Sequence, residues 1–445
     1  MARWSWQERS VGFAQQSDLT TKATSGFVYM PAEVSLPEFA RTVEDFQFGT
    51  MQAGASEPPV IGSKHGGSFT MRYPLQSMKT GYNPVTYTGG ISAANNIIAP
   101  GAVLFQHAIG GNTAGVSSNQ DFLDGKLGYD EVYDASGTAA GSSTATTNVN
   151  AGGGGTGSNY DEGNLLFAST ATTDPTPLLA WIKSISVDAI SHAEAAQTAA
   201  TTADKVWPTN TTAYSGDEPN PLTFRIVGDA VEFGIVLIGC VPTSWTFTGA
   251  AGSTPTIEIA YVYTDKIWDT SIGLLKAKSL FERVPPALGG RGGYVAFGTA
   301  TAAAERCGVH DFTISGESEL HFVPCHSKAQ GFSDFVVTGR SLSASFAIDH
   351  QSGDTVDGAG EHVHEADFVA GTYKSLSLFV GTVPGTVFAC FLPSWHISAQ
   401  PTLEDVDGVI YHRLTLRAGE HISDKTPAAL DVDKAADSIF RIAFA

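Results

Sequence analysis

Cys240-Val-Pro-Thr-Ser-Trp245 and Cys390-Phe-Leu-Pro-Ser-Trp395 are two versions of one short pattern in this chain. A second echo precedes each copy. Residues 62–71 and 339–348 both begin with glycine, and each contains a Ser-Phe pair, Ser68-Phe69 in the first and Ser345-Phe346 in the second. The two echoes occur in the same order along the chain. Patterns repeated in order indicate an internal duplication, with two similar structural units in one polypeptide.

The spacing of the echoes locates an insertion. Phe346 follows Phe69 by 277 positions, whereas Cys390 follows Cys240 by 150, so the first copy holds 127 more residues between its landmarks. That interval includes a Gly/Ala/Thr-rich stretch with the glycine run 152–155, which is typical of a flexible loop. We therefore predict a first β unit (1–109 plus 221–280), an insertion on the outer surface (110–220) and a second β unit (281–445).

Composition narrows the class of protein. The 445 residues include 45 acidic and 25 basic side chains, a formal net charge of −20, which argues against tight binding to a nucleic-acid backbone. There is no run of about 18 apolar residues of the kind that spans a membrane, and the first residues do not resemble a secretory signal. Four cysteines in a chain of this length do not form a disulfide framework, so synthesis in the cytosol is expected.

Alternating apolar and polar residues predict that the protein is mainly β. Strands are expected at 68–73, 222–226, 257–263, 345–349, 409–417 and 439–444, with a strand buried on both faces at 235–238. Helices are few: one over 100–109, and a longer one that begins near Pro177 and extends to about Thr201. Residues 43–64 are expected to form a long loop between two strands.

Two clusters have residue types that bind metals. The first is Cys307, His310, His321 and Cys325-His326, with ligand types that suit zinc, although adjacent strand residues point to opposite faces. The second runs from Glu361 to Glu365 and contains His362 and His364; an HxH pair in a strand would present both imidazoles on one face, but a loop or helix cap is favoured here.

No other pattern points to catalysis. The chain has no P-loop, dinucleotide fingerprint, nucleophile elbow or HExxH motif. Cys240 and Cys390 are expected to be buried structural thiols, and Trp245 and Trp395 core anchors rather than platforms for a ligand. We therefore assign no catalytic, cofactor-binding or metal-binding residue and expect neither cofactor nor enzymatic activity.

Several segments resemble the major tail tube proteins of long-tailed bacteriophages. The resemblance covers the opening (Trp6 to Glu8, Gly12 to Ala14 and Phe27 to Glu33) and a long acidic loop from Glu44 that leads into the strand Gly67 to Met71. It continues with a short apolar helix ending at Gly110-Gly111 and a closing strand, Ile439 to Phe444. The insertion at 110–220 has no counterpart in it.

This resemblance implies two tandem tail-tube-like β-sandwich units whose sheets join those of neighbouring subunits into a closed ring barrel. Six units usually make a ring, so a chain with two units would form a homotrimer with pseudo-sixfold symmetry. The rings would stack into a tail tube that conducts genomic DNA without specific binding. The protein would belong to the virion tail, be made in the host cytoplasm, and contact tail terminator, tape measure and baseplate proteins but no membrane.

The expected mechanism is passive: an inner wall with more carboxylates than Lys and Arg repels the DNA and lets it slide. Residues 43–64 and their counterpart at 319–337 are candidates for contacts between rings. Two alternatives remain open at this stage, another β-rich virion component such as a decoration or baseplate protein, and a metal-dependent β-barrel enzyme that uses the histidine clusters.

Overall fold

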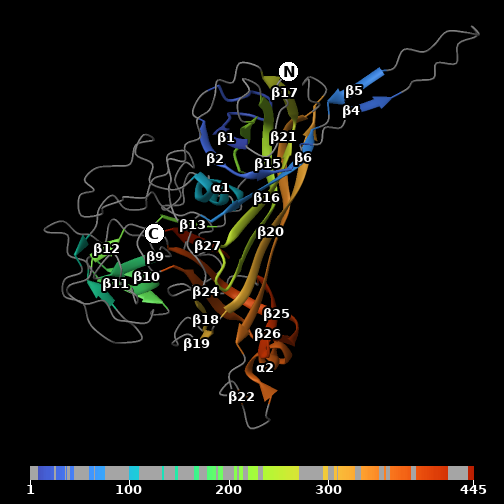
Figure 1. The fold of residues 1–445 in the computed structure, drawn as a ribbon. Helices are drawn as coiled ribbons and strands as arrows, with labels where there is room; N and C mark the ends of the chain where they lie inside the picture. The colour runs from blue at the N-terminus through green and yellow to red at the C-terminus, as the bar shows by residue number, and fades with distance from the viewer. Residues whose placement is uncertain are drawn as a thin grey trace, which may run out of the picture.

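Figure 1 shows the computed structural model of the chain as a ribbon. The structure describes residues 9–24, 27–35, 37, 41–44, 60–64, 66–75, 100–109, 133–134, 146–148, 165–169, 178–186, 189–193, 205–207, 210–213, 219–228, 234–269, 294–298, 305–307, 309–325, 332–349, 355–356, 361–381, 387–418 and 439–444.

The fold is mainly β, and seventeen of the described strands are hydrogen-bonded into one antiparallel sheet. Eight strands come from the N-terminal part and the return after the insertion: β1 (Arg9–Gln15), β2 (Val28–Pro31), β3 (Glu33–Val34), β6 (Gly67–Pro74), β14 (Leu222–Gly228), β15 (Gly234–Ala250), β16 (Thr256–Tyr263) and β17 (Asp265–Asp269). Eight come from the C-terminal part: β18 (Tyr294–Gly298), β19 (Glu305–Cys307), β20 (Val309–Pro324), β21 (Phe332–Asp349), β24 (Lys374–Val380), β25 (Phe388–Val406), β26 (Val409–Ala418) and β27 (Arg441–Phe444). The seventeenth, β13 (Asn210–Ala213), pairs with β27.

The two sets of eight strands pair in the same way. In the first set, β1 joins β2 and β14, β15 joins β14, β16 and β17, and β6 joins β16 and β3. In the second, β18 joins β19 and β24, β25 joins β24, β26 and β27, and β21 joins β26 and β20. In the part of the chain that the structure describes, each set also has one short helix at a corresponding place: α1 (Pro100–Ala108) follows β6, and α2 (Val363–Ala370) follows β21, the counterpart of β6.

The described strands form an open sheet, and the closed ring barrel expected from the sequence is not seen in the single chain. The sheet folds over itself around one core. Phe13 of β1 and Phe224 of β14 pack at 6.2 Å, and Phe224 lies 5.3 Å from Phe69 of β6 and 4.9 Å from Tyr261 of β16. Alternate residues of β6 and β16 are buried, as the sequence pattern predicts for strands that cover a core with one face.

The two sequence echoes are not in register with each other. Trp245 lies opposite Ile259, which lies opposite Met71. Trp395 lies opposite Ala418. On the other side of β26, Arg417 lies opposite Ser343, so the next residue, Ala418, falls opposite Leu342. The position that corresponds to Met71 is therefore Leu342, six residues before the Ile348 that the echo would match. An even shift leaves the same face buried, so alternation alone could not detect it.

The predicted long helix from Pro177 to Thr201 is wrong where the structure describes it. Leu178–Ser186 forms β10 and Ala189–Ala193 forms β11, in a six-stranded sheet with β7 (Tyr133–Asp134), β8 (Thr146–Asn148), β9 (Leu165–Ser169) and β12 (Lys205–Trp207). A short apolar run fits a strand as well as a helix, and pairing with β9 and β11 decided for the strand. Residues 194–201 lie outside the described part. Figure 1 shows this smaller sheet beside the second set of strands.

Other expected elements are present. The helix expected over 100–109 is α1, and the expected strands correspond to β6, β14, β15, β16, β21, β26 and β27. At the ends of the segment expected to be a long loop, β4 (Arg41–Glu44) and β5 (Val60–Lys64) form a hairpin that projects from the main sheet (Figure 1). A further pair, β22 (Thr355–Val356) and β23 (Glu361–His362), precedes α2.

Candidate assembly site

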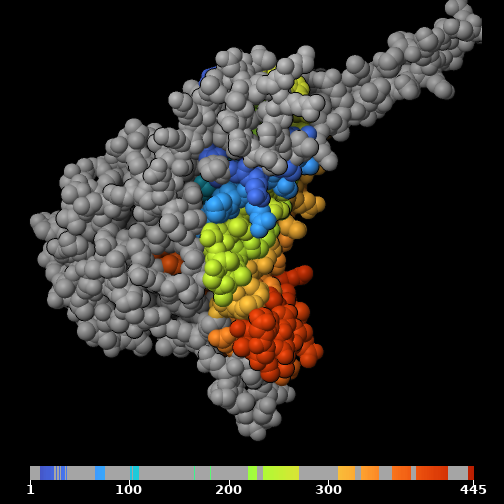
Figure 2. Space-filling view, viewed as in Figure 1, coloured from blue at the N-terminus to red at the C-terminus, as the bar shows by residue number. Residues whose placement is uncertain are grey.

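The two sets of strands meet at one antiparallel junction. The C-terminal half of β15 pairs with the N-terminal half of β20 from Ser244–Glu317 to Ala250–Asp311. Eight strands thereby run side by side in the order β3, β6, β16, β15, β20, β21, β26, β25. Figure 2 shows the surfaces of β15 and β16, β20 and β21, and β25 and β26 adjoining on one face of the molecule. The junction is therefore a connection between two similar units inside one chain.

Two glycines allow aromatic rings to lie across this junction. Trp245 is directly opposite Gly316, and Phe312 is directly opposite Gly249. A Cβ atom on Gly316 would lie 2.5 Å from the indole of Trp245, and one on Gly249 would lie 2.6 Å from the ring of Phe312. Each strand thus supplies one ring and one glycine, and a side chain at either glycine would displace the ring opposite.

The core side of the junction is an aromatic cluster. Phe247 of β15 lies 4.8 Å from Phe312 of β20 and 4.7 Å from Phe388 of β25, measured between ring centroids. Phe105 of α1 lies 5.2 Å from Trp245 and 6.2 Å from Phe388. Aromatic pairs at these separations stabilise beyond the area they bury. Rings from both sets and from α1 therefore hold the two units together.

The opposite face of the eight strands is polar and rich in hydroxyl groups. The hydroxyls of Thr248 and Thr256 are 2.9 Å apart, and those of Ser315 and Ser343 are also 2.9 Å apart. The pairing registers and the alternation of burial place the following hydroxyl residues on this polar face: Ser68, Thr70, Ser244, Thr246, Thr248, Thr256, Thr313, Ser315, Ser341, Ser343, Ser345, Ser398 and Thr415.

Carboxylates outnumber guanidinium groups on the described part of the polar face. The acids are Glu33, Glu258, Asp311, Glu317, Asp349 and Glu404, and the bases are Arg72, Arg413 and Arg417. Arg413 Nη2 donates to Glu404 Oε2 at 2.8 Å and to Asp311 Oδ2 at 3.1 Å. The hydrogen bonds that Arg413 donates to Glu404, and then those to Asp311, raise the pKa of Arg413. The two carboxylates compensate the charge of Arg413, so the described part of this face offers no cluster of uncompensated cations to a phosphate backbone.

The far half of the β20–β21 hairpin lies on the first set of strands. Phe335 is buried in a cluster with Leu19 and Val241, and Phe322 packs against the same cluster. The described residues of the range 319–337, which was expected to be a loop for contacts between rings, are thus mostly paired strand, and one side of these strands is occupied within the chain. Val336 on this hairpin remains exposed.

The residues of the first metal-binding candidate are not brought together in the fold. Cys307 ends β19, whereas His310 and His321 lie on β20 eleven residues apart, which is about 37 Å along a strand. Cys325 follows the end of β20, and His326 lies outside the described residues. No group of three potential metal ligands occurs in the part of the chain that the structure describes. The sequence places these ligand types close together, but an extended strand keeps them apart.

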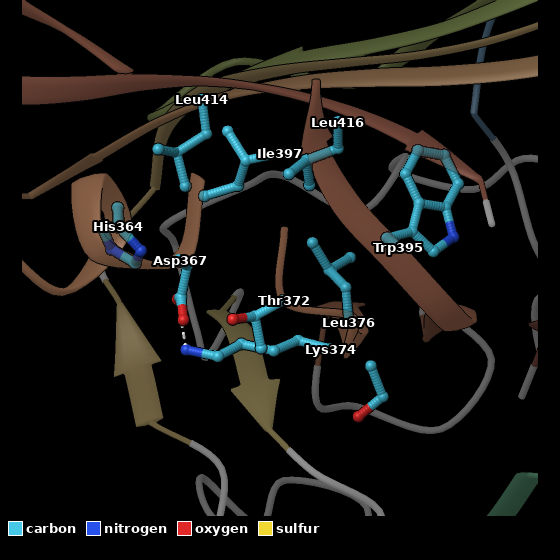
Figure 3. A pocket seen from close by; sticks show the side chains of 10 residues that line it. His364, Asp367, Thr372, Lys374, Leu376, Trp395, Ile397, Leu414 and Leu416 are labelled. Carbon is cyan, nitrogen blue, oxygen red and sulfur yellow. Dashed lines mark hydrogen bonds and ion pairs between the residues drawn. The ribbon is translucent and has the colours of Figure 1, made fainter. Parts of the chain in front are cut away.

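The second candidate spans an element boundary. His362 ends β23, whereas His364 is buried in the first turn of α2, with its ring 6.1 Å from that of His412 on β26. His364 also lines a small pocket of about 20 Å³ between α2 and the sheet, beside the Asp367–Lys374 ion pair (Figure 3). The other lining side chains include Leu376, Trp395 and Leu416. A space of this size holds about one water molecule, so it is a packing defect of the core rather than a ligand site.

The predicted core thiols and tryptophans are confirmed as buried. Cys240 and Cys390 have no exposed surface, and burial raises the pKa of both thiols. Trp245 and Trp395 are almost fully buried on the helix-covered side of β15 and β25. Sequence reasoning found these residues but not Gly249 and Gly316, because a glycine inside an alternating strand signals a close approach only once its partner is known.

No family model matches the chain, and no curated protein matches it by sequence. None of the helices in the described ranges is long and apolar enough to cross a membrane. The features that bear on function are the two similarly paired sets of strands, their junction and their polar face.

Proposed function

We propose that this chain is a structural subunit of a phage tail tube, which assembles into rings that stack as a hollow conduit for genome delivery. The observation that carries the proposal is the β15–β20 junction, where two similarly paired sets of strands join edge to edge into one continuous sheet. A unit that already joins a copy of itself within the chain can join further copies in the same manner. On this proposal a homotrimer supplies six units and closes a ring with pseudo-sixfold symmetry.

The polar face suits the wall of such a conduit. Where the structure describes this face, hydroxyl groups and an excess of carboxylates give a wetted surface without clustered cations, which are the groups that hold duplex DNA electrostatically. The proposed partners are further copies of the chain, the tail terminator, tape measure and baseplate proteins, and genomic DNA that passes without specific binding. The proposed location is the virion tail, after synthesis in the host cytoplasm.

Electron microscopy of the purified protein tests the proposal. We expect rings or tubes with a central channel, and trimers as the smallest closed species in native mass spectrometry. Isolated particles without a channel would favour another β-rich virion component, such as a decoration or baseplate protein. Monomers at all concentrations would contradict a tube subunit.

A further inference from the structure

We propose that the exposed apolar side of α2 docks onto the end of β17 in a second copy of this chain. The inference rests on the proposed tube function and deepens it by naming the surfaces that join neighbouring chains in a ring. The partner is another identical chain, and the contact repeats between chains the one that buries α1 inside each chain.

The two helices hold corresponding places in the two sets of strands but differ in burial. Every residue of α1 whose side chain the structure describes is buried. In α2, which the structure describes throughout, His364 alone is buried, while Phe368 packs partly against the core. Val369 in the last turn of α2 is 77% exposed, and Tyr373, which follows the helix, is 47% exposed. In the single chain α2 therefore keeps an apolar side open to solvent, whereas α1 is covered.

The end of the β25–β26 hairpin extends this apolar side. Leu403 is 61% exposed and lies opposite His412, and Ile410, two residues before His412, is 48% exposed. Alternate residues of a strand share a face, so Leu403, Ile410 and His412 lie on one side of the hairpin. The ring of His412 is 6.1 Å from that of His364, which places this side next to the first turn of α2. We define the α2 surface as Val369, Tyr373, Leu403 and Ile410.

The second set of strands covers α1 within the chain. Phe388 at the start of β25 lies 6.2 Å from Phe105 of α1, measured between ring centroids. Phe440, which precedes β27, stacks on Trp245 at 5.4 Å, and Trp245 lies 5.2 Å from Phe105. On this side α1 is therefore buried by the end of the second set where β25 begins and pairs with β27.

The corresponding end of the first set is where β15 begins and pairs with β17. Trp268 of β17 lies opposite Ile235, a core residue, as Phe444 of β27 lies opposite Phe388. The indole of Trp268 thus lies on the core side of its sheet. Trp268 is 54% exposed, although the Lys266 ammonium lies 5.7 Å from the centroid of its ring. The repeat therefore assigns this aromatic end to a second α2, whose exposed side chains are apolar.

The contact joins different surfaces of two identical chains, so it is heterologous and either closes a ring or continues as an open filament. Figure 1 shows α2 and β17 at opposite ends of the main sheet, as a head-to-tail arrangement requires. In a closed ring every α2 surface and every β17 end is covered, so neither remains as an apolar patch open to other proteins.

Lysine substitutions on the α2 surface test the contact in the full chain. Val369→Lys and Leu403→Lys each place a charge where an apolar partner covers the surface, so the trimer should dissociate at a protein concentration about tenfold higher or more. Native mass spectrometry over a dilution series measures the change, and circular dichroism checks that each variant folds as the parent does. Thr415→Lys is the matched control, because Thr415 is exposed on the polar face of β26, away from α2.

A charge pair across the contact tests β17 as the partner. Trp268→Glu alone should also weaken the trimer. Trp268→Glu combined with Val369→Lys should restore part of the association, because the two new charges attract each other. A Trp268→Glu variant with an unchanged trimer, or a double variant that restores nothing, refutes β17 as the docking end.

The outcomes separate this contact from the tube function. If the parent forms rings and both lysine variants form them equally well, the α2 contact is refuted and the tube function stands. If both variants weaken a trimer that microscopy shows without a channel, the contact stands and the tube function fails. A parent that stays monomeric at all concentrations refutes both.

Discussion

Gly316 lies under the indole of Trp245 at the junction between the two sets of strands. Gly316→Ala should lower the free energy of unfolding by about 1–3 kcal/mol, because the new Cβ would force the indole out of its packing. Chemical denaturation monitored by tryptophan fluorescence measures the change. Gly339→Ala is the control, since its nearest neighbour is the end of the Glu319 side chain at 3.2 Å. Equal changes in the free energy of unfolding for the two substitutions would contradict a stabilising role for the contact between the Trp245 ring and Gly316.

The buried thiols at Cys240 and Cys390 should be chemically inert. Burial raises the pKa of both, so little thiolate forms and reagents have no access. We expect the half-exposed Cys325 to react rapidly with a thiol reagent in the folded protein, and Cys240 and Cys390 only after denaturation. Cys240→Ala or Cys390→Ala should cost about 1–2 kcal/mol through lost packing. Fast labelling of either thiol without denaturant would disprove the prediction.

His107 on α1 should make the fold sensitive to acid. Its Nε2–H donates to the carbonyl of Asn220 at 2.7 Å, and burial lowers the pKa of the ring from 6.5 to about 4. A lowered histidine pKa means that its stabilising contribution is complete above pH 6.5 and is lost as the pH falls towards 4. The free energy of unfolding should fall by about 3 kcal/mol over this range, because each pKa unit corresponds to about 1.4 kcal/mol.

Denaturation midpoints measured from pH 7 to pH 4 check this prediction. His107→Gln keeps a donor for the Asn220 carbonyl but cannot titrate in this range, so its stability should vary less with pH than that of the parent. An unchanged pH dependence in the variant would show that other groups control acid sensitivity.

At the scale of elements, the β20–β21 hairpin is held to the first set of strands by Phe335. Its ring is buried with Leu19 and Val241, so Phe335→Ala should destabilise the protein by about 3–5 kcal/mol. Val336→Ala is the matched control, because Val336 is the next residue and is exposed; its effect should stay within about 0.5 kcal/mol. Thermal unfolding of both variants measures the difference, and similar melting temperatures would show that the hairpin is not anchored there.

The insertion shows a second contact between elements. Trp181 of β10 is almost fully buried, 5.4 Å from Phe391 of β25 and 6.4 Å from Phe379 of β24. Arg441 of β27 stacks on Phe391 at 4.5 Å. The six-stranded sheet of the insertion is therefore packed on the main sheet through a few large side chains. Its position on the outside of an assembly stays a prediction.

At the scale of the whole molecule, the charge of the polar face should decide how the assembled protein meets DNA. We expect weak or no binding of duplex DNA at physiological salt. Glu258→Lys combined with Glu317→Lys should bind more tightly, with a steeper loss of affinity as salt rises, because each new phosphate contact releases counterions. Fluorescence anisotropy over a salt series measures both quantities.

Glu365→Lys is the control for this charge reversal, because it lies on α2, which covers the opposite side of the sheet. Binding by this control as strong as that of the double variant would indicate an effect of net charge alone. Strong DNA binding by the unmodified protein would contradict the conduit mechanism.

Much of the fold could be predicted from residues close together in the chain. Alternation placed β6, β14, β16 and β26, because burial of one face imposes a period of two. The repeated Cys-to-Trp pattern located β15 and β25 and their buried side chains. The helix predicted from Pro177 failed because a short apolar run fits either element, and pairing with strand partners 3 to 16 residues away decided for the strand.

The sequence by itself determined the β class of this protein, its repeated landmarks, its buried thiols and its acidic net charge, since each depends on local pattern or composition. Only the tertiary structure decided the register of the second echo, the separation of the histidine cluster and the ring-over-glycine contacts at Gly249 and Gly316. These depend on which strands become neighbours. That choice follows from the burial of side chains far apart in sequence, and a shift by an even number of residues leaves the local pattern unchanged.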